Sequence, residues 1–429
     1  MQELYYSARA RYPILTVGLA MMAFIMVKTC RDAVFFDHGG LRQLPLAYVW
    51  IAVAAVPAAL FHLKALDRWG ARKTRTALFF LAAIVFLPFV PYADAEHRVL
   101  MTVMFIIVPT IFAAVLASVW LLASDLLDGA GVDTLRRVYS RIGAASMSGG
   151  IVGGLLAKGL SVYLSPRYLL VLGSCVLVVT GLLVAKAHRE HPIENDSERQ
   201  PQPEAMAADT DNGHAARPSA LMRQRYVQVL MAISALASIA ALYIDFQFYA
   251  AVTLSGHNNA QFFASFYIIL NLAALVIQLL VAPRLQAKVG IDGALMLLPG
   301  ALLGGLGLFA VWRIVQAQTM LRVVEGGLKS SIHRSMWEQV YLPIKRTFRD
   351  VAKVVVDGAV QRVAEGVGAS VLLIWFATTE TSLQQLSFTW LSWIIVVSSI
   401  LWLMLTRYLG ALGCADLQPS EVLIRLPDG

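Results

Sequence analysis

Residues 99–127 read VLMTVMFIIVPTIFAAVLASVWLLASDLL and contain a single charged side chain, that of Asp125. A helix of about 20 predominantly apolar residues can cross the roughly 30 Å hydrocarbon core of a bilayer, and this stretch is long enough to do so. Similar segments recur along the chain, at residues 12–34, 44–66, 76–93, 99–127, 139–161, 168–187, 226–254, 260–284, 293–312, 315–338, 354–378 and 386–408. The sequence therefore predicts an all-α polytopic membrane protein with about twelve transmembrane helices.

The composition argues against a soluble globular protein. Of the 429 residues, 58% are hydrophobic and 14% are charged, and a soluble domain has too little interior to bury so much apolar sequence. The formal net charge is +8, but no basic stripe is interleaved with exposed aromatic residues, as nucleic-acid binding would require. We therefore expect membrane lipids and a small molecule as partners, and no nucleic-acid polymer.

Lysine and arginine residues are concentrated in some of the predicted loops and absent from others, as in membrane proteins whose basic loops stay in the cytoplasm. Lysines and arginines gather between the second and third segments and before the eleventh, whereas the turns at residues 255–261 and 379–386 have none; the gathered residues are Lys64, Arg68, Arg72, Lys73, Arg75, Lys345, Arg346, Arg349 and Lys353. Loops rich in Lys and Arg stay on the cytoplasmic side. This distribution predicts that both termini lie in the cytoplasm.

A polar stretch divides the predicted spans into two groups of six. Residues 188–222 contain four prolines and several acidic residues, a mixture that cannot bury enough apolar area to fold and is typical of a flexible linker. The predicted domains are an N-terminal six-helix bundle at 1–187, the linker at 188–222, a C-terminal six-helix bundle at 223–410 and a cytoplasmic tail at 411–429. Two six-helix bundles are the plan of major facilitator transporters.

Two local patterns fit that plan. The stretch DRWGARK at residues 67–73 resembles the loop motif between the second and third helices of the major facilitator superfamily, and PRLQAKVG at 283–290 resembles a degraded copy in the second half. The fifth segment contains GGIVGG at 149–154, where small residues four apart let helix backbones approach closely in lipid. We expect this glycine-rich face to be a packing surface.

The segments also contain ionisable residues, each costing roughly 3 kcal/mol at a helix centre. They are Lys28, Arg31, Asp32, Asp125, Lys158, Asp245, Glu325, Lys329, Asp357, Arg362 and Glu365. Such residues must pair with one another, line water or lie near the membrane surface. Lys28 with Asp32, and Glu325 with Lys329, are four residues apart, a spacing that permits pairing on one helix face.

Several runs resemble the nucleotide (ATP/ADP) translocase family and its bacterial relatives within the major facilitator superfamily. They are KTCRDA at 28–33, Trp120 followed by Asp125 and by Arg136 and Arg137, DFQF at 245–248, FFASFY at 262–267, EGGLKSS at 325–331, YLP at 341–343, Lys353 and Asp357. Tyr249 departs from the family, which commonly has Lys there. The resemblance implies a multi-pass transporter of the bacterial inner membrane, whose first, fourth, seventh and tenth helices line its cavity.

The predicted function is secondary transport of an organic anion, such as a nucleotide or another phosphorylated solute, by alternating access. The candidate substrate-binding residues are Lys28, Arg31, Trp120, Asp245, Gln247, Glu325, Lys329 and Arg362. Arginine offers a planar donor fork for phosphate or carboxylate oxygens, and Asp245 and Glu325 are the candidate proton carriers. The open alternatives are a proton-coupled transporter of a siderophore or drug-like solute, and a non-transporting membrane scaffold.

The scattered histidines and three cysteines show no metal-ligand spacing and no catalytic motif. We therefore expect no catalytic residues, no metal, no cofactor and no enzymatic activity. A monomer is the expected oligomeric state.

Overall fold

The structure is a computed structural model, and it describes residues 2–38, 40–92, 97–127, 132–191, 224–257, 259–309, 315–341, 344, 352–378 and 388–414. Several predictions fall outside these residues. They concern most of the linker at 188–222 and of the tail at 411–429, the turn at 379–386, Leu342 and Pro343, and the basic residues Lys345, Arg346 and Arg349.

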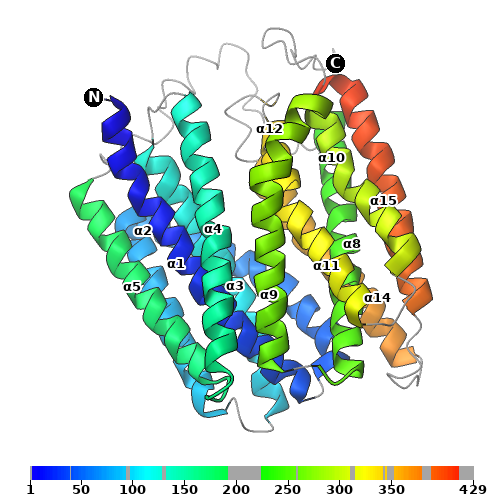
Figure 1. The fold of residues 1–429 in the computed structure, drawn as a ribbon, viewed down its shortest axis with the longest axis horizontal. Coiled ribbons are helices and arrows are strands. Elements are labelled where there is room, and N and C mark those ends of the chain that lie inside the picture. The colour runs from blue at the N-terminus through cyan, green and yellow to red at the C-terminus, as the bar shows by residue number, and fades with distance from the viewer. Residues whose placement is uncertain are drawn as a thin grey trace. The chain divides into compact units, whose positions relative to one another are not determined.

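The described residues form helices and no strand (Figure 1). The α-helices are α1 (Gln2–Asp37), α2 (Leu44–Phe86), α3 (Arg98–Leu126), α4 (Val132–Leu160), α5 (Tyr168–Glu190), α8 (Arg225–Leu254), α9 (Ala260–Val276), α10 (Ala282–Phe309), α11 (Val315–Leu328), α12 (Arg334–Val340), α14 (Gln361–Thr378) and α15 (Phe388–Leu409). Short 3₁₀ helices lie at η1 (Gly40–Arg42) and η2 (Leu87–Tyr92), and π-helical segments at η4 (Ile277–Val281), η5 (Lys329–His333), η6 (Val354–Val360) and η8 (Gly410–Cys414).

Nine helices in the described part of the chain are long and apolar enough to cross a membrane. The other three predicted spans, at 139–161, 293–312 and 315–338, also coincide with helices, namely α4, α10 and α11 continued by η5 and α12. Two of them are less apolar because α4 carries glycines and Lys158, and α11 carries charged residues. The glycines of α4 and the charged residues of α11 take part in contacts described below.

Contacts between helices divide the chain into two compact units. Unit 1 comprises Met1–Gly213, Tyr249–Leu275 and Ala369–Gln385, and unit 2 comprises His214–Phe248, Val276–Gly368 and Leu386–Gly429. The domain boundaries given above, which divide the chain at the linker, stay a prediction.

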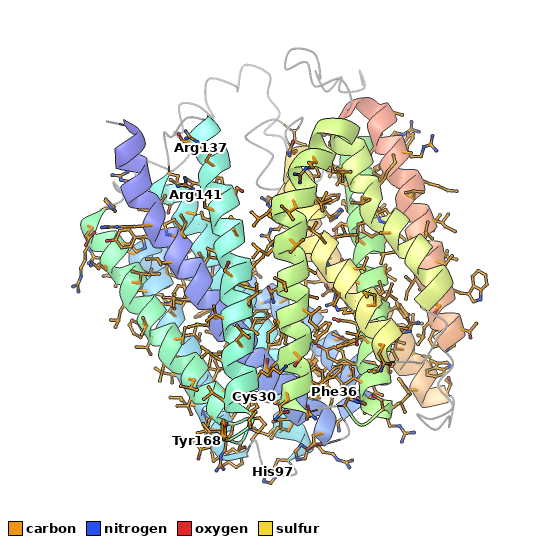
Figure 2. The ribbon with its side chains drawn as sticks, viewed as in Figure 1. Cys30, Phe36, His97, Arg137, Arg141 and Tyr168 are labelled. Carbon is orange, nitrogen blue, oxygen red and sulfur yellow. The ribbon has the colours of Figure 1, made fainter. Side chains whose placement is uncertain are left out.

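Helix α1 is the central helix of unit 1. It packs against α3, α4 and α5, and α2 packs against α3 and α5 (Figure 1). Figure 2 places Arg137 and Arg141 of α4 at one end of this unit, and His97 and Tyr168 at the other. These labelled residues mark the two ends of the helices of unit 1.

Helix α4 uses its four clustered glycines on two faces. A β-carbon added at Gly149 would overlap the carbonyl oxygen of Gly18 on α1, whereas one added at Gly150 would overlap the side chain of Asn271 on α9. Gly153 and Gly154 repeat the arrangement one turn later, against α1 and α9 respectively. The prediction that this stretch is a packing surface is therefore confirmed.

The predicted basic loop at 67–73 is a sharp turn within α2. Gly70 has φ 76° and ψ 161°, a backbone conformation that is essentially restricted to glycine. The Thr74 hydroxyl donates a hydrogen bond of 2.8 Å to the carbonyl of Ala65 across this turn. The turn separates the spans Leu44–Leu66 and Arg68–Tyr92.

In unit 2, polar side chains of α8 bind the neighbouring helices. The Tyr226 hydroxyl donates to the carbonyl of Val340 at 2.6 Å, and the Tyr243 hydroxyl donates to that of Gly368 at 3.2 Å. Ser234 donates to the carbonyl of Val356 at 3.1 Å. Helix α10 packs against α11 and α15.

Candidate functional site

A buried carboxylate, Asp32, is the centre of a polar cluster in unit 1. The guanidinium of Arg31 donates to Asp32, with an Nε–Oδ1 distance of 2.7 Å, and the hydroxyls of Tyr249 and Tyr267 both donate to Oδ2. The Tyr249 bond is 3.1 Å long. All four side chains are buried, and Asp32 is completely so. An arginine and two phenols thus replace the water that a buried carboxylate lacks.

Aromatic rings surround the cations of this cluster. The Arg31 guanidinium lies 4.2 Å from the centre of the Phe105 ring, and the Lys28 ammonium lies 4.6 Å from that of Tyr267. Phe36 stacks on Tyr249 with ring centres 4.4 Å apart. Phe36 and Cys30, labelled in Figure 2, lie on either side of Arg31 and Asp32 in the sequence of α1. Cation–π contacts of this kind stabilise a charge away from water.

The structure pairs Asp32 with Arg31 rather than with Lys28, although the spacing of Lys28 and Asp32 permits an ion pair. Lys28 contacts the ring of Tyr267 instead of the carboxylate. Tyr249, where the translocase family commonly has Lys, contributes a hydrogen-bond donor to the same carboxylate.

A second network, in unit 2, joins α8 to α11. The Nε atom of Arg322 lies 2.5 Å from Oδ1 of Asp245, and its Nη1 atom contacts Oε2 of Glu325. The Lys329 ammonium lies 3.7 Å from Oε1 of Glu325, as their spacing along the helix allows. Two acids and two bases therefore form one chain of ion pairs with no net formal charge.

Burial differs along this network. The Glu325 side chain is 2% exposed, whereas those of Arg322 and Asp245 are 18% and 25% exposed. Lys329 is 48% exposed and begins the π-helical segment η5. π-Helical distortions are frequent at functional sites.

Arg322 is a site residue that is absent from the candidates predicted from the sequence. It lies within the predicted span 315–338, three residues before Glu325, so the rule that singled out the other membrane charges also applies to it. Its contact with Asp245 joins residues far apart in the sequence, and no local spacing indicates that pairing.

The remaining candidates lie outside these two networks. Gln247 is fully buried and donates to the Ser392 hydroxyl at 3.0 Å. Trp120 stacks on Tyr139, with ring centres 6.0 Å apart. Arg362 forms an ion pair of 2.8 Å with Glu365, three residues along α14.

Asp125 forms an ion pair with Arg75. The two groups are 2.6 Å apart, and both side chains are at least 90% buried. This pair corrects the interpretation of Arg75 as a residue of the basic loop, since it lies in the helix beyond the Gly70 turn. Asp357 likewise has partners, accepting hydrogen bonds of 2.7 Å from Trp337 and Tyr341.

Within the described residues, no group of three or more His, Cys, Asp or Glu side chains could hold a metal ion. Several ionisable groups of the helices instead form ion pairs, among them Arg31–Asp32, Arg75–Asp125, Arg322–Asp245 and Arg362–Glu365. The arginine of such a pair can exchange one anionic partner for another, because its guanidinium can donate hydrogen bonds to any carboxylate or phosphate of suitable geometry.

No protein-family model and no curated protein sequence matches the chain. Solved structures do match its fold. The nucleoside transporter NupG superposes with a TM-score of 0.62 at 12% identity, over 94% of this chain and 98% of that one. An auto-inhibited peptide transporter of the POT family gives a TM-score of 0.64 at 12% identity, over 94% and 96% of the two chains. The POT family transporter PepTSo gives 0.64 at 11% identity, over 94% and 98%.

At these identities the comparison shows the fold. It agrees with the helical composition and with the apolar spans described above. The chain is an all-α, multi-pass membrane protein with the fold of major facilitator transporters.

Proposed function

We propose that this protein is a secondary transporter that moves an organic anion across the bacterial inner membrane by alternating access, with nucleotides and other phosphorylated solutes as the first candidates. In this proposal it acts as a monomer, catalyses no reaction, and has both termini in the cytoplasm.

The observation that carries the proposal is the ion-pair chain Asp245–Arg322–Glu325–Lys329. Charges within membrane helices are costly, and they are usually found where they bind or move an ion or a substrate. The side chains of Arg322 and Lys329 are 18% and 48% exposed, so neither is fully enclosed by the protein. Arginine and lysine are the side chains that bind phosphate and carboxylate groups.

Two further observations support it. The fold is similar to those of a nucleoside transporter and of peptide transporters, which move small solutes. The resemblance of KTCRDA at 28–33 and EGGLKSS at 325–331 to the translocase family favours a phosphorylated solute among organic anions.

The test uses purified protein in proteoliposomes. Uptake of radiolabelled ATP, ADP and AMP is measured with and without internal nucleotide, and with and without a pH gradient. We expect saturable uptake by the wild type and its loss in Lys329→Glu, because an acid at that position repels an anion. Arg11→Gln is the control, since Arg11 is exposed and pairs with Glu190 away from the networks. Uptake that survives Lys329→Glu would argue against this role of Lys329.

A second candidate is a proton-coupled transporter of another solute, such as a siderophore or a drug-like molecule. The position of Asp245 favours it, because this acid lies in a membrane helix, is 25% exposed and pairs with Arg322. The solute separates the candidates. The second candidate takes up a siderophore or a drug-like molecule in place of a nucleotide or another phosphorylated solute, and that uptake collapses with an uncoupler.

A further inference from the structure

We infer that the guanidinium of Arg322 binds the anionic group of the substrate. In the protein without substrate, the Asp245 carboxylate occupies the guanidinium instead. When the substrate displaces this carboxylate, Asp245 takes up a proton. The inference rests on the proposed function and deepens it. It defines the substrate as a solute that presents a carboxylate or phosphate group and is carried together with a proton.

The guanidinium of Arg322 contacts two carboxylates. Arg322 directs its Nε edge to Asp245 on α8 and its Nη1 atom to Glu325 on its own helix. A carboxylate or phosphate must therefore replace one of these two acids to reach the donors that they occupy.

Asp245 is the acid that can leave. Glu325 is buried, is attached to the same helix as Arg322, and also has Lys329 as a partner. Asp245 is more exposed and belongs to another helix, so that the Arg322–Asp245 pair is the link between α8 and α11 in this network. A change in the spacing of α8 and α11 breaks this ion pair and leaves the Arg322–Glu325 pair intact.

Charge balance then requires a proton. In the resting network Asp245 and Glu325 are negative while Arg322 and Lys329 are positive, which sums to zero. A singly charged group placed on Arg322 would leave an excess negative charge within the membrane, where such a charge is costly. The released Asp245 carboxylate takes one proton from water, which offsets one negative charge of the substrate, with no covalent change in the substrate.

The neighbouring charges support this assignment. Helix α14 packs on α8 at Gly368, which lies against Leu242. The acid and base of α14, Glu365 and Arg362, pair with each other. The Asp357 carboxylate accepts two hydrogen bonds from Trp337 and Tyr341. Arg322 thus pairs with Asp245 in the described part of unit 2, whereas Arg362 pairs with Glu365.

Transport by matched variants tests the inference. Proteoliposomes are supplied with radiolabelled AMP, ADP, ATP or inorganic phosphate, and a pH-sensitive dye records proton uptake. The wild type should accumulate an anion when the exterior is acidic, with alkalinisation of that exterior. Asp245→Asn imitates the protonated acid, so it should still exchange internal for external anion but lose accumulation driven by the pH gradient.

Arg322→Gln should lose both exchange and accumulation, and Arg322→Lys should raise the KM because lysine lacks the planar fork. Because a lone Arg322→Gln leaves two acids with one base and can impair folding, the double variant Asp245→Asn, Arg322→Gln removes the pair together. It should elute as a monodisperse protein and remain inactive. The exposed control Arg11→Gln should retain both activities.

The outcomes are distinguishable. If the wild type moves none of the four probes, the proposed function fails and this inference fails with it. If the wild type moves an anion and either Arg322→Gln or the double variant does so equally well, the inference is wrong and the proposed function stands. Accumulation by Asp245→Asn that still follows the pH gradient would overturn the role of Asp245 alone.

Discussion

Asp32 accepts hydrogen bonds from the side chains of Arg31, Tyr249 and Tyr267, which come from α1, α8 and α9. Because the carboxylate is completely buried, each donor replaces a water molecule that the charge would otherwise lack. Hydrogen bonds to a charged group contribute more than those to a neutral one, about 1.5–3 against about 0.5–1.5 kcal/mol. Loss of a single hydrogen-bond donor to Asp32 should therefore measurably lower the stability of the protein.

Removal of one phenol should reveal this difference. Tyr267→Phe deletes a donor to Asp32, and we expect it to lower the free energy of unfolding by about 1.5–3 kcal/mol. Tyr243→Phe is the matched control, because its buried hydroxyl donates to the neutral carbonyl of Gly368. Thermal unfolding in detergent should give the larger shift for Tyr267→Phe. Equal shifts would mean that Asp32 depends little on this phenol.

The Arg75–Asp125 pair allows a second prediction at the scale of residues. Loss of one member leaves a buried charge without its partner, so Arg75→Gln or Asp125→Asn alone should destabilise the protein by about 3–5 kcal/mol. The double variant should cost less than the sum of the two, because no unpaired charge remains. Unfolding curves in micelles measure all three, and additive effects would contradict a direct pair. The exposed Arg11–Glu190 pair is the control, and Arg11→Gln should change the free energy of unfolding little.

At the scale of elements, the glycines of α4 explain how three helices approach one another closely. Gly149 and Gly153 contact α1, while Gly150 and Gly154 contact α9. In lipid, association depends on such packing because water is not expelled.

The glycine contacts predict opposite effects for the same substitution in one helix. Gly149→Ala places a methyl group against the backbone of Gly18, which cannot move aside as a side chain can, and we expect a loss of about 1–3 kcal/mol. Gly143→Ala meets no atom within 4 Å and should be neutral, or stabilising by up to about 1 kcal/mol. The thermal midpoints of the purified variants in one detergent provide the comparison. A stable Gly149→Ala protein would show that α1 and α4 lie farther apart.

Element positions could be predicted from the sequence to different degrees. Hydropathy located α3 and α5 because the bilayer requires long apolar helices, whatever they pack against. The turn at Gly70 was expected only as a loop, since a one-residue reversal leaves no signal in hydropathy. The π-helical segment at Lys329 was not predicted, because it depends on a local shift of backbone hydrogen bonds.

At the scale of the whole molecule, the predicted topology can be tested by labelling. In a background with Cys30→Ala, Cys175→Ala and Cys414→Ala, we introduce His257→Cys or Lys73→Cys, both at exposed positions. A membrane-impermeant maleimide should label His257→Cys on intact cells, and Lys73→Cys only after permeabilisation. The expectation follows from the basic residues around Lys73 and their absence around His257. The reverse labelling pattern would invert the orientation.

The candidate site was predictable only where it is local. The Glu325–Lys329 pair follows from a spacing of four residues, and the structure contains it. The Arg322–Asp245 pair joins residues of two helices that are far apart in the sequence, so no local spacing indicates it. Arg31 binds Asp32 while its guanidinium lies over the ring of Phe105, and Lys28 lies over the ring of Tyr267; these ring contacts are not visible in the spacing of the three residues.

The Arg322–Asp245 pair has a consequence for how the protein is made. Asp245 leaves the ribosome 77 residues before Arg322 (322 − 245), and each of these charges resists partition into lipid by about 2.5–3.5 kcal/mol on its own. Helix α8 is one of the spans that are long and apolar enough to cross a membrane, whereas α11 has 14 residues and carries Arg322 and Glu325. We therefore expect α11 to enter the bilayer beside an α8 that is already in place, where Asp245 awaits Arg322 as its partner.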